Sequence, residues 1–341
     1  FHPVLPTIDV VEPGALSTLQ DYPGRVGYWH VGVPPSGPMD DLSFRWANRL
    51  VGNGDEAAAL ELTMTGPALQ FHKETVIALT GAKMEASLDG KPVPFWEAVK
   101  VPAGAMLELG AISGAGQRTY LAVRHGFEAA EFLGSTATFT LGGFGGHAGR
   151  ALKAGDVLHM KEGGAVRPPM NAPLAESLRP ELAREWEVGV LYGPHGAPDF
   201  FDEDDIAALF TAAYEVHFNS ARTGVRLIGP KPKWARPDGG EAGLHPSNIH
   251  DNAYAVGTLD FTGDMPILLG PDGPSLGGFV CPVTVAEAER WKLGQLKPGD
   301  KLRFVPVAYE DARRMREAQT TALAAEAPSL RDAPRAASPA R

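Results

Sequence analysis

The sequence predicts a mostly β protein made of two related β-barrel subdomains with a few short helices. Glycine (40 residues) and proline (30 residues) make up about a fifth of the 341-residue chain, against roughly 12% in average proteins, and both interrupt helices and favour turns. The second observation is an internal repeat, because residues 152–156 and 296–300 both read Leu-Lys-Xaa-Gly-Asp and lead into apolar segments. A repeat of this length that occurs twice indicates two related subdomains rather than a solenoid of many short units.

The elements of the first half follow from local signals along the chain. A helix is expected over residues 40–51, because start signals precede it at residues 36–41 and a glycine at position 52 is a stop signal. Asp89-Gly90 stands between alternating residues and is the strongest short hairpin signal. Strands are expected at residues 75–80, 105–109 and 119–124, where apolar and β-branched residues gather.

Changes in composition mark three regions. The first β-barrel subdomain is expected over residues 1–165 and the second over residues 181–308, with a proline-containing junction at 163–180. The remaining residues, 309–341, turn to alanine, glutamate and arginine, which favours a helix over residues 309–325. A tail with three prolines at residues 328–341 is expected to be disordered.

Charge and cysteine content exclude several classes of function. With 31 basic and 41 acidic residues, the formal net charge is −10, which disfavours non-specific binding to nucleic acid or to an anionic membrane. The single cysteine, Cys281, excludes an internal disulfide framework and a cysteine-cluster metal site. Apolar runs stay far below the roughly 18 residues of a membrane span, and no secretory signal is visible. We therefore expect a protein of the reducing cytoplasm.

The first candidate site is a turn-rich stretch at residues 20–40. Prolines there fix the backbone, and glycines allow a ligand to approach the backbone closely. Its candidate binding side chains are Asp21, Tyr22, Arg25 and Ser36. A structural interpretation also stays open, in which Ser36 and Asp40 cap the following helix while Asp21 and Arg25 form a surface pair.

The second candidate site is residues 239–254, which carry His245, Asn248, Asp251 and Tyr254 after a glycine run. Such side chains can bind a metal, perform acid–base chemistry or orient a polar substrate. A metal site needs at least three ligands in a fixed geometry, and the spacing of His245, His250 and Asp251 matches no metal motif, so no metal is expected. A structural loop stays an alternative, but the pattern favours a small-molecule site.

Other catalytic motifs are absent from the sequence. It contains no Gly-Xaa4-Gly-Lys-Ser/Thr phosphate loop and no Gly-Xaa-Ser-Xaa-Gly elbow. The glycines at 142–146 have a counterpart at 277–278, which indicates a crossing shared by the two barrels rather than a phosphate cradle. Cys281 is expected to be a buried packing residue, because nothing near it in the sequence marks a stabilised thiolate.

Both stretches resemble segments of a known family. Residues 20–53, which begin QDYPGRVGYWHVGVPPSGPMDD, resemble the opening of the carboxyltransferase subunit family first named allophanate hydrolase subunit 2. Residues 219–286, which include GGEAGLHPSNIHDNAYAVGTLDF, are similar to its urea carboxylase branch in particular. The likeness covers nearly everything from residue 8 to residue 307. It implies two cyclophilin-like β-barrel subdomains, in agreement with the internal repeat.

The resemblance implies the carboxyltransferase subunit of a biotin-dependent urea carboxylase, a multi-subunit ligase of nitrogen metabolism. Such a subunit passes the carboxyl group of N-carboxybiotin to a urea nitrogen and gives allophanate. The implied partners are a companion subunit similar to allophanate hydrolase subunit 1, a biotin carboxyl carrier, and a biotin carboxylase that alone uses ATP. Because the chain lacks the Ala/Val-Met-Lys-Met hairpin of a carrier, biotin is expected to visit on a separate carrier. The chain by itself is expected to be inactive or nearly so.

The same resemblance suggests roles for the second stretch. Asn248 and Asp251 are expected to contact the substrate, because a neutral amide offers urea both a donor and an acceptor. His245 and Tyr254 are expected to hold the urea carbonyl or to relay a proton. The four residues of the first stretch would face the same cleft or the partner subunit. Weaker candidates for holding a carboxyl group are Lys231, Lys233 and Arg222.

Three other functions stay open at this point. One is a subunit of ATP-dependent 5-oxoprolinase, whose branch of the superfamily works without biotin. Another is a carboxylase subunit that acts on guanidine or on another amide. The third is a non-catalytic regulatory binding module, because relatives include partners of bacterial kinase-inhibitor proteins.

Overall fold

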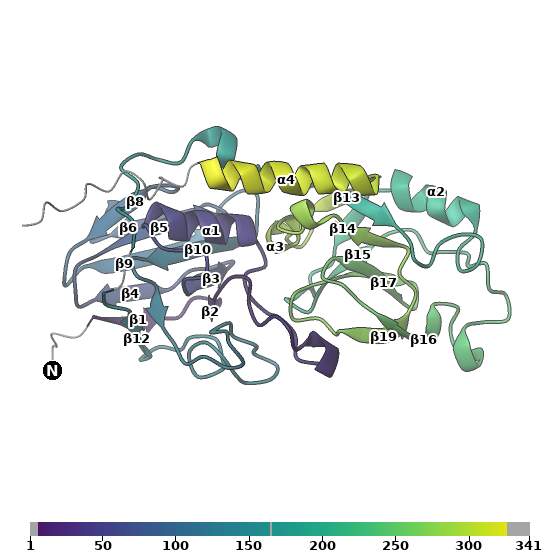
Figure 1. The fold of residues 1–341 in the computed structure, drawn as a ribbon, viewed down its shortest axis with the longest axis horizontal. Helices are drawn as coiled ribbons and strands as arrows, with labels where there is room; N and C mark the ends of the chain where they lie inside the picture. The colour runs from purple at the N-terminus through teal and green to yellow at the C-terminus, as the bar shows by residue number, and fades with distance from the viewer. Residues whose placement is uncertain (1–5, 164–165, 326–341) are drawn as a thin grey trace, which may run out of the picture.

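The structure is a computed structural model that describes residues 6–163 and 166–325. Strands dominate it, and they form two units that lie side by side, with helices between and above them (Figure 1). The predicted fold class, mostly β with β-barrel subdomains and a few short helices, is confirmed, and one of the two units closes into a seven-strand barrel. The predicted tail at 328–341 lies outside the described residues. No helix of the described chain is long and apolar enough to cross a membrane.

Two antiparallel sheets build the first unit. The larger has the strand order β11-β12-β1-β4-β9-β6-β7, and the smaller has the order β2-β3-β10-β5-β8. Their inward side chains form one apolar core that includes Ile8, Leu62, Phe71, Leu107 and Leu121. The strands are β1 (Thr7–Glu12), β2 (Leu16–Gln20), β3 (Ala59–Thr63), β4 (Ala68–Phe71), β5 (Thr75–Gly81), β6 (Met84–Leu88), β7 (Lys91–Pro92), β8 (Ala98–Val101), β9 (Met106–Ile112), β10 (Arg118–Val123), β11 (Phe127–Glu128) and β12 (Val157–Met160).

The second unit is a closed barrel of seven strands in the order β13-β20-β17-β18-β15-β14-β21. Val188, Leu259, Phe261 and Phe304 are among the residues that fill its interior. Two further strands, β16 and β19, pair only with each other and form a ribbon outside the barrel wall. The strands are β13 (Glu185–Tyr192), β14 (Tyr214–Val216), β15 (Gly224–Ile228), β16 (Asn248–Ala253), β17 (Thr258–Thr262), β18 (Met265–Leu269), β19 (Leu276–Phe279), β20 (Val283–Val285) and β21 (Lys301–Pro306).

The helices lie on the outside of the sheets and between the units. Helix α1 (Asp41–Leu50) matches the helix expected at 40–51, and its apolar face packs on β5 and β10. Helix α4 (Tyr309–Ala325) has the bounds expected from the sequence and runs across both units along the top of Figure 1. The others are α2 (Glu203–Thr211), α3 (Lys292–Gln295), η1 (Trp29–Val31), η2 (Glu176–Leu178), η3 (Glu241–Gly243) and η4 (Glu287–Glu289).

The internal repeat corresponds to one turn that is built twice. Asp156 accepts a hydrogen bond from the Lys153 backbone N–H (2.7 Å), as Asp300 does from Lys297 (3.1 Å). Gly155 and Gly299 have φ of +87° and +85°, a conformation that favours glycine. The same turn therefore introduces β12 in the first unit and β21 in the second.

The glycine part of the repeat is not shared, contrary to expectation. Residues 142–146 form turns, whereas Gly277 and Gly278 belong to strand β19. A reason for glycine is visible at Gly277, where a Cβ would lie 2.7 Å from the Tyr254 hydroxyl. That glycine lets the ribbon pack closely against Tyr254.

Candidate active site

A cleft of about 630 Å³ opens where the two units meet under helix α4. The first unit contributes the turn-rich loop before α1 and the first turns of α1 itself. The second unit contributes the ends of two connections, at Ala255–Val256 and Pro271, together with the segment from η4 to α3. The volume lies within the range of about 300–1,000 Å³ that small-molecule sites occupy. The lining residues that carry the argument below are Tyr22, Arg25, Ser36, Arg45, Glu287 and Arg290.

The charge of the cleft favours an anionic ligand. Four arginines and two carboxylates line it. Glu287 pairs with both Arg290 (3.1 Å) and Arg316 (3.2 Å), so its single negative charge is shared between two guanidinium groups. Burial raises the pKa of the other carboxylate, Asp41, although Arg45 and Arg290 oppose that rise. Arg45 is also paired with Asp55 (2.8 Å). The positive excess of the cleft therefore comes from Arg25 and from Arg290 and Arg316, which share one carboxylate, and it attracts negatively charged groups. No cluster of metal-binding side chains was found in the described chain.

Arg25 and Ser36 form the most enclosed polar part of this wall. Arg25 is 0% exposed and donates to the carbonyls of Phe132 (2.8 Å) and Ala137 (2.8 Å). Its guanidinium also lies against the Phe132 and Phe144 rings, which pack on each other at 4.5 Å between centroids. Ser36 is 3% exposed. Within the described residues, Arg25 Nη1 and Ser36 Oγ are both buried without a hydrogen-bond partner. Buried polar groups are normally satisfied, so unpartnered ones beside a cleft indicate a place where a ligand binds.

The backbone conformation of Ser36 supports the same conclusion. Its φ is +53°, in the left-handed region that non-glycine residues rarely adopt. Such strained conformations persist only where the surroundings impose them, and they concentrate at functional sites. Here the Ser36 N–H donates to the Pro271 carbonyl of the second unit (3.0 Å). The loop is therefore fixed from both sides of the cleft.

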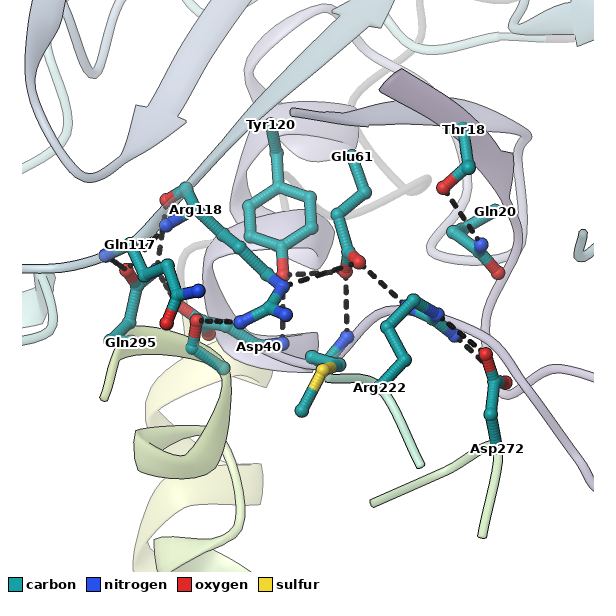
Figure 2. A network of polar contacts seen from close by, with 12 residues as sticks. Thr18, Gln20, Asp40, Glu61, Gln117, Arg118, Tyr120, Arg222, Asp272 and Gln295 are labelled. Atoms are coloured by element: carbon teal, nitrogen blue, oxygen red, sulfur yellow. Dashed lines mark hydrogen bonds and ion pairs between the residues drawn. The ribbon is translucent and has the colours of Figure 1, made fainter. Parts of the chain in front are cut away.

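Behind the loop, a buried polar network joins the two units (Figure 2). Glu61 on β3 accepts from the Met39 N–H (2.8 Å), and Tyr120 on β10 accepts from the Asp40 N–H (2.8 Å). Arg222 of the second unit donates to the Gly37 carbonyl (2.7 Å). These bonds hold residues 37–40, which directly follow Ser36, so they help to fix the position of the Ser36 hydroxyl.

The network centres on an arginine between two carboxylates. Arg222 donates to Glu61 (2.6 Å) and to Asp272 (2.8 Å), and all three side chains are buried. Burial alone would raise the pKa of Glu61, but Arg222 and then Arg118 more than offset it, so this pKa is lowered. Burial would lower the pKa of Arg222, which Asp272 and Glu61 reverse. Glu61 and Arg222 are therefore both charged at neutral pH.

Asp40 adds a buried carboxyl group to this network. It caps α1 by accepting from the Ser43 N–H (2.9 Å) and hydroxyl (2.6 Å), and it accepts from Gln295 Nε2 (2.7 Å). Burial raises the pKa of Asp40 to about 7, because the hydrogen bonds from Ser43 and Gln295 offset the cost of burial only in part.

This raised pKa predicts a pH dependence of stability. Since the folded pKa lies above the unfolded value of 3.8, Asp40 stabilises the fold most below about pH 4 and loses that contribution as the pH rises toward 7. Asp40→Asn cannot ionise. We therefore expect its free energy of unfolding, relative to the parent chain, to rise by about 2 kcal/mol between pH 5 and pH 8. Guanidinium chloride titrations measure this difference, and parallel pH profiles of the two proteins would contradict the prediction.

Three of the four candidates from the first stretch line the cleft, namely Tyr22, Arg25 and Ser36. Tyr22 lies against the Arg45 guanidinium, 4.7 Å from ring centroid to Cζ. Asp21 does not line the cleft. It accepts from the Ser135 hydroxyl and from the Thr136 N–H, both at 2.6 Å. Asp21 therefore supports the loop whose carbonyl groups hold Arg25.

The candidates of the second stretch lie on or near the ribbon instead. Asn248 is half-buried at the start of β16, and Asp251 is exposed on the same strand. Neither lines the cleft, although the chain reaches it at Ala255.

His245, Lys231 and Tyr254 have other surroundings. His245 Nδ1 lies 3.0 Å from the Ser247 hydroxyl, and its Nε2 lies 3.4 Å from Asp264. Lys231 is largely exposed and pairs with the same Asp264 (2.8 Å). Tyr254 is buried and lines a second cavity, between the ribbon and the barrel. Three of the nine candidates therefore line the cleft and one lines this second cavity, whereas the other five line neither, namely Asp21, Lys231, His245, Asn248 and Asp251.

Sequence reasoning missed several residues of these places. Arg45, Arg290 and Arg316 line the cleft but lie far apart in the chain. Glu61 and Asp260 are buried acids inside strand segments that are otherwise largely apolar. The sequence did contain a signal for these two acids, because each stands between two apolar residues of a strand. A charged side chain is rarely buried without a partner, so such a position indicates a buried polar site.

Comparison with known proteins identifies the family to which the chain belongs. The family model described as "Carboxyltransferase domain, subdomain A and B" matches residues 31–306. The urea amidolyase of Saccharomyces cerevisiae is 52% identical over 322 residues, which cover 93% of this chain and 17% of that protein. A 5-oxoprolinase subunit of Escherichia coli is 30% identical over 321 residues, covering 92% of this chain and 95% of that protein. The crystal structure of Kluyveromyces lactis urea carboxylase matches with a TM-score of 0.90 at 49% identity, covering 94% of this chain and 29% of that one. The chain thus spans less than a fifth of the urea amidolyases that it matches.

Proposed function

This chain belongs to the family of carboxyltransferase domains with subdomains A and B, and from that premise we propose that it transfers the carboxyl group of N-carboxybiotin to a urea nitrogen, giving allophanate. The observation that carries the proposal is the positively charged cleft with two unpartnered polar atoms, Arg25 Nη1 and Ser36 Oγ. The identity to urea amidolyase supports urea as the substrate.

The residues of the cleft fit a carboxylated ring. Arg25, Arg290 and Arg316 offer charge to a carboxylate, and the two unpartnered atoms are both hydrogen-bond donors. Apolar wall residues such as Met39, Leu293 and Val256 suit the body of a ring. When bound, carboxylated biotin supplies the activated carboxyl group.

The protein's own residues then bind, orient and exclude water. The arginines hold the carboxylate, and Ser36 Oγ donates a hydrogen bond where negative charge develops. Two carbonyl acceptors and the adjacent aromatic pair hold the Arg25 guanidinium in place, so it is pre-organised. On the substrate side, Asn248, Asp251, His245 and Tyr254 stay the proposed contacts of urea.

The proposal includes partners. In it, biotin arrives on a carrier domain, ATP is used only by a biotin carboxylase, and a companion carboxyltransferase subunit or domain completes the site. Support comes from the length of the relatives, since a urea amidolyase is more than five times as long as the segment that this chain matches. In this scheme the chain has little activity without those parts.

A comparison of substrates tests the function. The chain is assembled with a companion carboxyltransferase subunit, a biotin carboxylase and a biotinylated carrier, and ADP release is measured with urea, guanidine or 5-oxoproline as the only acceptor. We expect release with urea. Release with 5-oxoproline and without biotin would instead favour the second candidate function, a 5-oxoprolinase subunit. This function is a specific rival because the chain matches 95% of the length of the Escherichia coli 5-oxoprolinase subunit. Release with none of the three would favour a regulatory binding module.

Ser36→Ala gives the sharper test of the cleft. The hydroxyl has no partner in the described chain, so its removal should leave the free energy of unfolding unchanged. If the hydroxyl binds the carboxyl donor, urea-dependent ADP release should fall about tenfold to hundredfold. Ser113→Ala, at an exposed serine that does not line the cleft, serves as the control. Full activity in Ser36→Ala would remove this hydroxyl from the site.

A further inference from the structure

A third cavity, of about 630 Å³, lies at the end of the first unit where strand β1 begins, on the left of Figure 1. Its lining comes from the starts of β1 and β5 and from residues at or just beyond the ends of β4, β8, β10 and β12, so it opens between the two sheets. The mouth of a β-barrel is a common place for a ligand. None of its lining residues lines the cleft, so this cavity is a separate place in the molecule.

The cavity combines an apolar floor with a charged rim. Val101 (1% exposed) and Met160 (4% exposed) belong to the core of the first unit and form the floor. Lys73, Lys100 and Lys161 are exposed and stand at the rim. A molecule that fills this space therefore gains from an apolar body, which the floor shields from water, and from a polar group at the rim.

The charge of the rim is positive, although the whole chain has a net charge of −10. Four basic side chains line the cavity against two carboxylates. Lys73 pairs with one of these carboxylates, Glu162. Within the described part of the chain, Lys100 and Lys161 have no ion pair. Two ammonium groups are thus free to attract a negatively charged group.

Arg124 and His125 give the cavity a fixed polar corner. Arg124 Nη1 donates to the carbonyls of Val51 (2.9 Å) and Arg167 (3.0 Å). The His125 N–H donates to Asn53 Oδ1 (2.7 Å), and the φ of His125 is +69°, in the left-handed region. Among the described residues, His125 Nδ1 is buried without a hydrogen-bond partner. A strained backbone and an unpartnered polar atom in one wall are features of a binding site.

We propose that this cavity binds a small organic anion, with its apolar body on Val101 and Met160 and its anionic group at the rim, near Lys100 and Lys161. The inference goes beyond the proposed function and does not depend on it, because the cavity and the cleft share no lining residue. A carboxylate and a phosphate both suit two ammonium groups, so the experiment compares the two.

Binding is measured on the full chain without ATP or partners. The probe is 8-anilinonaphthalene-1-sulfonate, which joins an apolar body to an anionic group and fluoresces when it is shielded from water. We expect saturable binding that octanoate and octyl phosphate displace, and the more potent of the two identifies the preferred anionic group. Octylamine, which has the same tail but a positive charge, should displace the probe at least tenfold less well, and so should inorganic phosphate, which has no tail.

Charge reversal at the rim tests the location of the site. Lys100→Glu combined with Lys161→Glu should weaken probe binding at least tenfold at low salt, and high salt should reduce this difference. The matched control is Lys83→Glu combined with Lys91→Glu, at exposed lysines of the same unit that do not line the cavity, and it should bind like the parent chain. Pro102→Trp, at an exposed edge of the cavity, should weaken binding by filling the space.

One more variant separates this cavity from the cleft, which is also positively charged. Arg316→Glu changes the cleft alone and should leave probe binding unchanged. No saturable binding by the parent chain would overturn the inference. So would equal binding by the parent chain and the variant of Lys100 and Lys161, or a loss of binding caused by Arg316→Glu alone. Because binding is measured without urea or ATP, none of these results depends on whether the assembled enzyme carboxylates urea.

Discussion

Replacing Arg222 with methionine should lower the free energy of unfolding by about 3–5 kcal/mol. The guanidinium group of Arg222 bonds to Glu61 and Asp272, and all three groups are buried at the junction of the two units. Removal of the arginine leaves two carboxylates without compensation in a region of low dielectric constant. Arg118 stays near Glu61, at 3.4 Å, and can offset only part of that loss.

Chemical denaturation measures this effect, and two comparisons locate its cause. Arg303→Met, at an exposed arginine of β21, should change stability by less than about 0.5 kcal/mol. Adding Glu61→Gln and Asp272→Asn to Arg222→Met should recover part of the loss, because it removes the unpaired charges. A loss below about 1 kcal/mol in the single variant would show that the triad does not hold the units together.

Asn248→Ala should reduce urea-dependent ADP release in the assembled enzyme about a hundredfold or more. A neutral amide can donate to the urea carbonyl and accept from its N–H groups, and alanine can do neither. Sites that recognise a substrate through hydrogen bonds lose the most when one partner is removed. The bicarbonate-dependent charging of biotin occurs elsewhere in the proposed assembly, so it should continue unchanged.

The control for this experiment lies on the same strand. Asn252 is also on β16, but its side chain donates to the adjacent Ala253 carbonyl (3.1 Å), and Asn252→Ala should keep most of the activity. Unchanged turnover in Asn248→Ala would remove Asn248 from the substrate site. A comparable loss in both variants would instead show that the ribbon as a whole had been disturbed.

Local signals determined much of the secondary structure. Asp40 caps α1 as its position before the helix suggests, and Asp89-Gly90 forms the predicted turn between β6 and β7. The repeated Leu-Lys-Xaa-Gly-Asp segment forms the same turn in both units. These features depend on contacts within a few residues, so the sequence order contains the information that decides them.

The interior of the site depends on residues that are far apart in the chain. Glu61 and Arg222 are separated by 161 positions, and Gln295 meets Asp40 across 255. Neither pairing has a spacing that a motif could reveal. Arg222 was a candidate for holding a carboxyl group on the basis of its charge, whereas the structure shows it bonded to Glu61 and Asp272 at the junction of the two units.

The sequence by itself determined the mostly β class, the doubling of the subdomain and the two polar stretches, because composition, repeats and turn residues act locally. Only the tertiary structure decided that Tyr22, Arg25 and Ser36 line one cleft while Tyr254 and Asp260 line a neighbouring cavity. The physical reason is burial: packing of the two units, and of the ribbon on the barrel, removes water from particular polar atoms and leaves some without a partner among the residues described. Which atoms these are cannot be read from their order along the chain.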